Sequence, residues 1–300
     1  METRNVKCVF CNADDYEIKF PEGKAQVHRI VKCNNCGLMY ANPQTISSMS
    51  GKVSLLNGEE VNVTVDCDEY KKFTPEANAY LQKQYIQCKD YKKILEFINS
   101  KERGTLLDIG SYAGLFLNDA KLNGWNVLGI EPLAVPRLYS QNIFGLNIIS
   151  TPFEEANIKN NSVDVIVSCH VIEHIYNPIN FVNKAYNLLN TNGIMVLETP
   201  TYDSFSFKVL RHHERSLRCD GHIYFFTKKS LRSLVEKCGF HVIKHETVGR
   251  TLSLERLMTN IGIMISNRKL LNNIANRMQL NKFILHVNIH DMQRIYCTKN

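Results

Sequence analysis

The stretch that most constrains this chain runs from Leu106 to Gly114 and reads LLDIGSYAG. Its apolar start predicts a buried strand, and the apolar residues after Gly114 recur at the spacing of a helix. Gly110 permits a tight turn and a close approach of the backbone to a ligand, because it has no Cβ atom. A strand, a glycine turn and a helix start are the elements that bind nucleotide-like cofactors, although plain strand-to-helix turns share this pattern.

Further strands are expected downstream of this stretch, with helical patterns between most of them. They are expected at residues 126–132, 147–150, 163–168, 193–200, 241–248 and 288–299. A helical pattern at 75–100 precedes the first strand, and an apolar-basic helical pattern runs from 252 to 280. This alternation predicts an α/β fold with a doubly wound, seven-stranded and mostly parallel sheet, whose site lies at the carboxyl ends of the strands.

Two Cys-x-x-Cys pairs lie near the amino end of the chain. Cys8 and Cys11 form the first pair, and Cys33 and Cys36 follow after 21 intervening residues. Each pair suits a tight turn, so that four thiolates can meet at one tetrahedral zinc ion. We therefore expect a small β zinc ribbon at 1–45, a linker at 46–74 and the larger domain at 75–300. A module of this size does not fold without its metal.

The charges of the chain are unevenly distributed. Residues 201–300 carry 17 Lys and Arg against 7 Asp and Glu, a net charge of +10, whereas the whole chain carries +7. This basic third favours a phosphorylated or acidic substrate, nucleic acid or a membrane surface, with a solvated basic face as the plain alternative. No apolar run reaches the roughly 18–20 residues of a membrane helix, and METRNVKC lacks a signal-peptide core, so a cytoplasmic protein is expected.

Four motifs stand in an order and at a spacing that resemble a known family. They read LLDIGSYAG, VLGIEP, SVDVIVSCHVIEHIYNP and NGIMVLETP. Their succession resembles class I S-adenosylmethionine-dependent methyltransferases, in the branch of the ubiquinone-biosynthesis O-methyltransferases and the sugar methyltransferases. GHIYFFTKKSLRSLVEKCGF is similar to the same branch, and CVFC with CNNCGLMYANP resembles the zinc ribbon that precedes such domains in some bacterial proteins. The resemblance implies a Rossmann-like domain whose last strand inserts antiparallel beside the sixth, with a helical insertion at about 251–281.

The resemblance also implies which residues bind S-adenosylmethionine. Asp108 and Gly110 would line its methionine end, and Glu131 would hold the ribose hydroxyls. The full set is Asp108, Gly110, Ser111, Tyr112, Gly114, Glu131, Pro132, Pro152, Phe153, Cys169 and His170, with Pro152 and Phe153 at the adenine wall. Tyr112 departs from the family, which usually has a glycine there. Because a tyrosine resists positive φ, we expect the loop to differ locally or to place the ring over the cofactor.

A base is needed to remove the proton of the methyl acceptor. The candidates are His170, His174 and His222, with Glu173 and Tyr224 behind them, since an imidazole accepts a proton near neutral pH. His170, Glu173 and His174 also resemble the E-x-x-E-H metal site of some members of this superfamily. A divalent ion there is an alternative, although His170 replaces an oxygen ligand that such cations prefer.

These features predict methyl transfer to a small polar acceptor, most simply a hydroxyl of a sugar or of a nucleotide-linked or carrier-linked sugar. The expected partner is a small, phosphate-bearing molecule, and a homodimer is also considered. An RNA methyltransferase is an alternative, but the ribbon lacks a clear basic stripe with interleaved aromatic residues. A methyltransferase fold that binds its cofactor without catalysis is another, and Tyr112 is the feature that favours it.

Overall fold

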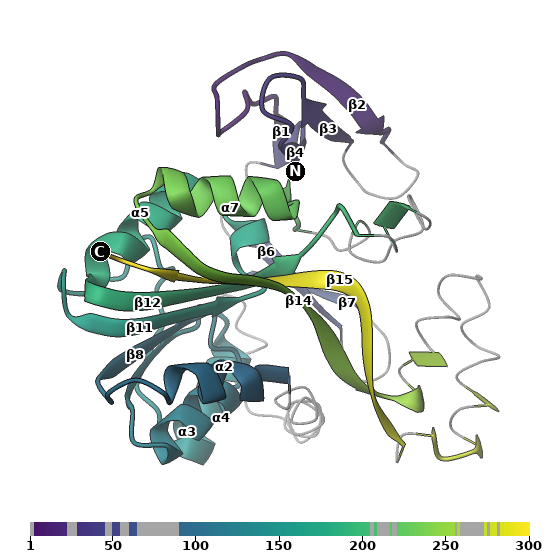
Figure 1. Cartoon of the computed structure of the whole chain (residues 1–300). Coiled ribbons are helices and arrows are strands. Elements are labelled where there is room, and N and C mark those ends of the chain that lie inside the picture. Colours follow the sequence, from purple (N-terminus) through teal and green to yellow (C-terminus); the bar gives the residue numbers. More distant parts are fainter. Residues whose placement is uncertain are drawn as a thin grey trace.

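A seven-stranded sheet forms the centre of the molecule (Figure 1). A computed structural model of the chain describes residues 3–22, 29–45, 50–54, 60–64, 90–204, 207–208, 217, 221–255, 257–258, 273–274, 277–280 and 283–300. In spatial order the strands are β10 (Ile148–Ile149), β9 (Asn126–Ile130), β8 (Thr105–Ile109), β11 (Val163–Cys169), β12 (Leu189–Pro200), β15 (Ile284–Thr298) and β14 (His241–Ser253). The first five pair in parallel, and β15 is antiparallel to both of its neighbours. The predicted mostly parallel sheet is confirmed.

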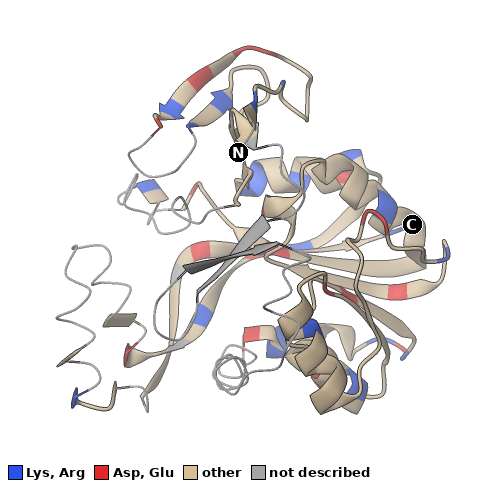
Figure 2. Ribbon diagram, turned by 180° about the vertical axis from the view of Figure 1, so that it is seen from behind, with Lys and Arg blue, Asp and Glu red and all other residues tan. Residues whose placement is uncertain are grey.

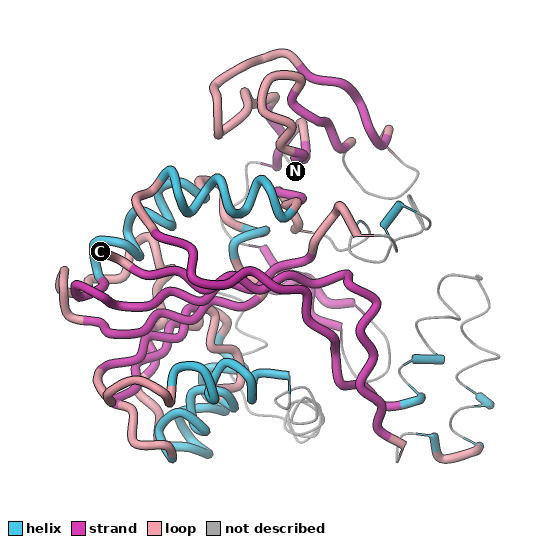
Figure 3. Tube along the Cα trace, viewed as in Figure 1, coloured by secondary structure: helices cyan, strands magenta, loops and turns pink. Residues whose placement is uncertain are grey.

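The central strands are apolar on both faces because helices cover both sides of the sheet. Helices α2 (Lys92–Ile98), α3 (Leu115–Leu122) and α4 (Ala134–Phe144) lie on one side, and α5 (Pro178–Leu188) and α7 (Lys228–Lys237) lie on the other (Figures 1 and 3). Val165 and Val167 of β11 pack in the core under α2 and α3, whereas Ile166 packs in the core under α5 and α7. None of the described helices is long and apolar enough to cross a membrane.

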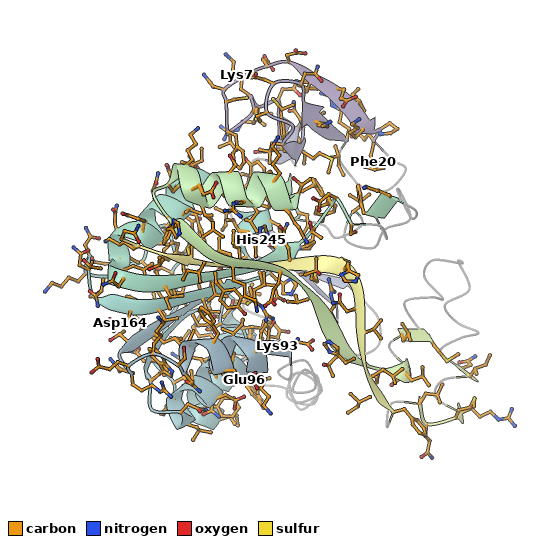
Figure 4. All side chains as sticks on the ribbon, in the orientation of Figure 1. Lys7, Phe20, Lys93, Glu96, Asp164 and His245 are labelled. Carbon is orange, nitrogen blue, oxygen red and sulfur yellow. The ribbon has the colours of Figure 1, made fainter. Side chains whose placement is uncertain are left out.

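Asp164 fixes the amino ends of three strands, at the edge of the sheet opposite the expected site (Figure 4). Its carboxylate accepts hydrogen bonds from the backbone N–H of Thr105 on β8 at 2.7 Å and from the side-chain amide of Asn190 on β12 at 2.7 Å. Asp164 is therefore a structural residue, and the chemistry must come from the carboxyl ends of the same strands.

The last two strands are longer than the sequence predicts. β14 continues through Ser253 and β15 begins at Ile284, so the predicted insertion at 251–281 starts with strand residues rather than helix. The pair extends beyond the rest of the sheet as a two-stranded arm (Figure 1). Most of the insertion lies outside the described residues, as does the predicted helix at 75–100 before residue 90.

The amino-terminal ribbon has three antiparallel strands, β2 (Tyr16–Phe20), β3 (Ile30–Cys33) and β4 (Met39–Ala41). A fourth strand, β13 (Tyr224–Phe225), comes from the methyltransferase-like part of the chain and pairs with β4. The short strands β1 (Thr3–Arg4) and β5 (Gln44–Thr45) also pair, and β6 (Ser50–Ser54) and β7 (Glu60–Thr64) form a hairpin in the predicted linker. The ribbon therefore shares a sheet with the larger part of the chain.

Candidate functional site

The loop after β8 turns through three residues with left-handed backbone. Gly110, Tyr112 and Gly114 have φ values of 75°, 48° and 72°. Tyr112 thus adopts the conformation that a glycine would adopt there, and its backbone N–H donates to Glu131 Oε2 at 2.9 Å. Tyr112 therefore takes up positive φ in spite of its side chain, and the Glu131 carboxylate stabilises the turn.

Close packing explains the two glycines of this loop. A Cβ atom on Gly110 would lie 2.4 Å from Val171 Cγ2, and one on Gly114 would lie 2.6 Å from Ser140 Cβ. Any larger residue would push the loop away from its neighbours. Ser111 between them is buried, and its Oγ atom has no hydrogen-bond partner among the described residues. That hydroxyl remains available to a ligand.

Two carboxylates lie buried beside the loop, at the carboxyl ends of β8 and β9. Asp108 is 6% exposed and Glu131 is 4% exposed. Burial, together with the charge of Glu131, raises the pKa of Asp108 to about 8. Burial also raises the pKa of Glu131 to about 7, against the effect of the N–H groups of Leu133 and Tyr112 that bond to it. A ligand that brings an ammonium group and hydroxyl donors would stabilise both ionised carboxylates.

The other predicted cofactor residues differ in exposure and in the contacts that they make. The carbonyl of Pro132 accepts a hydrogen bond from Arg137 Nη1 at 2.7 Å, and Pro152 is half-buried. Phe153 belongs to the core, where its ring packs against Phe181 and under the Lys184 ammonium. Pro152 and Phe153 are the residues of the expected adenine wall, and Pro152 is the more exposed of the two.

His170 follows β11 and stands between two buried carboxylates. Its Nδ1 atom is 3.7 Å from Glu173 Oε1, and its Nε2 atom is 3.5 Å from Glu198 Oε1. Burial lowers the pKa of His170, but the two carboxylates outweigh it and bring the pKa to about 9. The side chain keeps 38% exposure, which weakens these attractions without reversing them. His170 therefore favours its protonated form at neutral pH, and in that form it cannot accept the proton of an acceptor.

Glu198 in turn is held by a buried arginine. Arg294 of β15 is 1% exposed, and its Nε atom donates to Glu198 Oε2 at 2.7 Å. A second nitrogen, Nη2, donates to the backbone carbonyl of Asp90 at 3.0 Å. Burial raises the pKa of the neighbouring Cys169 thiol, and the charge of Glu198 raises it further, so Cys169 stays a neutral thiol.

Glu173, His174 and His222 form a compact group of metal-type ligands. Each offers a ligand atom, and the three atoms lie within 4.8 Å of one another. Glu173 is fully buried; its Oε2 accepts from Thr199 Oγ1 at 2.9 Å, while Oε1 accepts no hydrogen bond from the described residues. Burial raises the pKa of Glu173, but His170, His174 and His222 outweigh it and lower it to about 2. This carboxylate is therefore ionised and could hold a cation.

The grouping differs from the one that the sequence suggests. Only a 3₁₀ turn, η3 (Ile172–His174), forms there, so His170, Glu173 and His174 do not share one helix face. His170 lies between Glu173 and Glu198, and it is His222 that joins Glu173 and His174 in the group of ligand atoms. Tyr224, the remaining candidate base, is buried and donates its hydroxyl to the carbonyl of Tyr176 at 3.0 Å. Burial raises the pKa of Tyr224 to about 12.

The four ribbon cysteines converge as predicted. Cys8 Sγ lies 3.4 Å from Cys36 Sγ, Cys11 Sγ lies 3.5 Å from Cys33 Sγ, and all four sulfurs lie within 4.8 Å of one another. Four sulfurs at the Zn–S distance of about 2.3 Å would be about 3.8 Å apart, so these positions fit one tetrahedral zinc ion. Burial raises the pKa of the Cys8 and Cys36 thiols, and the backbone N–H groups of Phe10 and Leu38 act against it by favouring the thiolates.

Comparisons with known proteins agree with this arrangement. Residues 79–245, more than half of the chain, match the family model described as "Methyltransferase domain". The chain belongs to this methyltransferase family. The resemblance seen in the four motifs is confirmed at the level of family and fold.

Among curated proteins, the ubiquinone biosynthesis O-methyltransferase of Rickettsia canadensis is 27% identical over 114 residues, which cover 36% of this chain and 48% of that protein. The one of Bartonella tribocorum is 24% identical over 186 residues, covering 57% and 73%. The chain thus spans about half the length of the first of these relatives.

Solved methyltransferases share the fold: a SAM-dependent methyltransferase from Archaeoglobus fulgidus superposes with a TM-score of 0.51 at 16% identity, covering 74% of this chain and 99% of that one. One from Thermotoga maritima gives 0.50 at 18%, covering 77% and 98%.

Several residues of this methyltransferase site were missed by the sequence reasoning. Glu198 lies near the carboxyl end of β12, so the rule that selects Asp108 and Glu131, a carboxylate at the carboxyl end of a strand, could have selected it too. Arg294 and Arg137 carry no such signal, because their partners are distant or are backbone carbonyls. Only the tertiary structure identifies them.

Proposed function

We propose that this chain transfers the methyl group of S-adenosylmethionine to a hydroxyl of a small polar acceptor. The observation that carries the proposal is the buried pair Asp108 and Glu131 beside a left-handed turn, with three histidines at the neighbouring strand end. S-adenosylmethionine supplies a methyl group on a sulfonium cation, which is reactive towards a nucleophile placed in line. The protein must hold that cofactor, orient the acceptor and take up its proton.

The cofactor half consists of β8, β9 and the loop between them. In the proposal, ionised Asp108 receives the ammonium group of the cofactor, and Glu131 accepts from the ribose hydroxyls while keeping its bond from Tyr112. Both carboxylates have raised pKa values, so binding a cation would draw protons off them. The sulfonium end would then lie towards β11 and the histidines.

His174 is the preferred base of the acceptor half. Its Nδ1 atom lies 2.9 Å from the carbonyl of Gly221, and a carbonyl only accepts, so Nδ1 carries a proton and, in the neutral ring, Nε2 is the atom that can accept one. His222 stacks edge-on against it at 4.7 Å, and its Nδ1 atom is 3.3 Å from the hydroxyl of Tyr202. In the alternative route, Glu173, His174 and His222 would hold a divalent cation, which would lower the pKa of the acceptor hydroxyl.

The chemistry of the acceptor is the finer part of the proposal. A hydroxyl is favoured because curated relatives are named O-methyltransferases. A sugar hydroxyl, with or without a phosphate-bearing carrier, is the specific expectation. The support from basic charge is reduced, since four cations of the last third are paired with carboxylates in the structure. These pairs are Arg232–Glu236, Lys244–Glu246, Arg250–Asp291 and Arg294–Glu198.

An RNA substrate receives less support. The described ribbon carries charges of both signs (Figure 2), and Lys19 and Lys32 both pair with Glu17. A nucleic-acid surface would instead present unpaired cations along one stripe. The non-catalytic alternative rested on Tyr112, and that residue keeps the turn that a glycine would make.

Two experiments test the function in order. Isothermal calorimetry with S-adenosylhomocysteine tests the cofactor half without needing an acceptor, and absence of binding would refute the proposal. Methyl transfer from radiolabelled S-adenosylmethionine is then measured against nucleotide sugars and phenols, with and without EDTA. Transfer to a phenol but not to a sugar would replace the sugar expectation. Loss of transfer in EDTA with recovery in Mg²⁺ or Mn²⁺ would favour the metal route over the His174 base.

A further inference from the structure

The ribbon reaches the acceptor half of the site through a continuous chain of backbone hydrogen bonds. The N–H of Ala41, at the end of β4, donates to the carbonyl of Ile223 at 2.8 Å. The N–H of Ile223 donates to the carbonyl of Glu173, also at 2.8 Å. The backbone of one residue, Ile223, is therefore held by the ribbon through its carbonyl and by a site residue through its N–H. His222 is the residue immediately before Ile223, so its position depends on both bonds.

Two of the four ribbon cysteines, Cys33 and Cys36, lie at the turn that leads into β4. Cys33 ends β3, its N–H donates to the carbonyl of Leu38 at 2.9 Å, and the N–H of Gly37 donates to the carbonyl of Cys33 at 2.9 Å. This turn places Cys33 and Cys36 directly before Met39, where β4 starts. A metal ion that joins them to the other cysteine pair would fix the β3–β4 hairpin, and with it the edge on which β13 pairs.

Packing joins the same parts on both faces of the ribbon sheet. Tyr40 and Tyr224 face each other across β4 and β13 and belong to the main core, whereas Met39 and Phe225 pack in a second cluster on the other face. That second cluster includes Tyr202, whose hydroxyl is the contact of His222. The ribbon is therefore linked to His222 through the backbone of β13 and through the ring of Tyr202.

The cofactor loop is fastened in a different way. The N–H groups of Gly110 and Ser111 both bond to the carbonyl of Ile130, at 2.8 and 3.0 Å, and Tyr112 bonds to Glu131. These contacts remain within the loop that follows β8 and the end of β9. The hydrogen bonds that hold the two halves of the site thus come from different parts of the chain.

We propose that the cysteine ribbon is a wall of the acceptor half, and that β4 positions His222 through β13 when the four cysteines hold their metal. The ribbon metal then controls the order of the acceptor half, while the cofactor half keeps its shape without it. The role of this wall in catalysis rests on the proposed function, whereas the structural coupling of the ribbon to His222 does not. The proposal makes Ala41 and Ile223 positioning residues that act through His222.

Hydrogen exchange on the full chain, loaded with zinc or stripped by a chelator, tests the coupling. Stripping should raise the exchange rate about tenfold or more in peptides that cover 221–226, together with those that cover 30–41. Peptides that cover 105–114 and 126–133 should change little, and S-adenosylhomocysteine affinity measured by calorimetry should stay within about threefold. Adding zinc back should restore the protection of both affected regions at the same zinc concentration.

Two results would overturn the proposal. In the first, 221–226 stays protected while 30–41 exchanges freely, so that the ribbon does not support β13. In the second, stripping exposes 105–114 as well, so that the metal stabilises the whole fold rather than one half of the site. Failure of the proposed function has a different signature, because S-adenosylhomocysteine would then bind neither form while the exchange pattern still reports on the coupling.

A pair of variants separates the β4–β13 contact from the metal itself. Ala41→Pro removes the N–H that bonds to Ile223 and leaves all four sulfurs in place. It should retain zinc by metal analysis and lose protection at 221–226, and unchanged protection with zinc retained would contradict the proposal. If the variant cannot hold zinc, the stripped wild-type protein decides. Lys237→Gln is the matched control, since Lys237 also bonds to the ribbon, at the carbonyl of Phe10, but on α7 away from His222.

Discussion

The cofactor half and the acceptor half of the site are built in opposite ways. In the first, Asp108 and Glu131 lie 23 residues apart in the sequence, and the loop between them bonds to its own strands. In the second, Glu173, Glu198, His222 and Arg294 come from four separate segments, and a strand of the ribbon borders them. The comparison teaches that one half of a site can be held by local contacts while the other half is assembled from distant segments of the chain.

The largest expected effect is a loss of stability in the acceptor half. Replacing Arg294 by Met leaves Glu198 buried without its partner, which should lower the free energy of unfolding by about 3–5 kcal/mol. Urea denaturation monitored by circular dichroism measures it. The matched control is Arg232→Met, which breaks the exposed pair with Glu236 and should cost less than about 1 kcal/mol. Equal losses in the two variants would show that the Arg294–Glu198 pair does not hold the acceptor half together.

The next largest effect is on ligand binding to the cofactor half. Glu131→Ala removes the acceptor for the ribose hydroxyls and the carboxylate that holds the backbone of Tyr112. We expect the affinity for S-adenosylhomocysteine to fall about 100-fold, the equivalent of about 2.7 kcal/mol. Glu155→Ala changes an exposed carboxylate of a neighbouring loop and should leave the affinity unchanged in the same calorimetric titration. If both variants bind as wild type does, Glu131 has no part in the cofactor site.

The raised pKa of Asp108 gives the ligand-free protein a definite pH dependence. The folded state keeps the proton of this carboxyl up to about pH 8, whereas the unfolded chain releases it near pH 4. Raising the pH from 6 to 8 should therefore lower the free energy of unfolding by about 2 kcal/mol through this group alone. Asp108→Asn should lose that part of the slope in urea titrations at several pH values. An unchanged slope would mean that Asp108 is not held protonated.

The smallest effect sharpens the account of the loop. Tyr112 holds positive φ, which asparagine tolerates and a β-branched residue resists. Tyr112→Asn should change the free energy of unfolding by less than about 0.5 kcal/mol, whereas Tyr112→Val should cost about 1–2 kcal/mol. Thermal denaturation of the two variants side by side measures the difference. A Val variant as stable as the Asn variant would show that the left-handed turn is not needed.

The difference between the halves also explains how much of the molecule the sequence could predict. Strand and helix periodicity was enough to predict the sheet, and the motif order was enough to place Asp108 and Glu131 at neighbouring strand ends, because these features are local. The Cys-x-x-Cys spacing was likewise enough for the convergence of four sulfurs. The pairing of β13 with β4 could not be predicted, because two-residue strands carry no periodic signal. The Arg294–Glu198 pair could not be predicted either, because no pattern near either residue in the sequence indicates the other as its partner.

The central claim is that the loop after β8 holds S-adenosylmethionine between Asp108 and Glu131. The most direct test is calorimetric titration of the wild-type protein and of Asp108→Asn with S-adenosylhomocysteine at pH 7. The account predicts saturable binding at one site in the wild type and affinity reduced about tenfold or more in the variant, which cannot supply the charge that faces the ammonium group. Absence of binding to the wild type, or equal binding by both proteins, would contradict it.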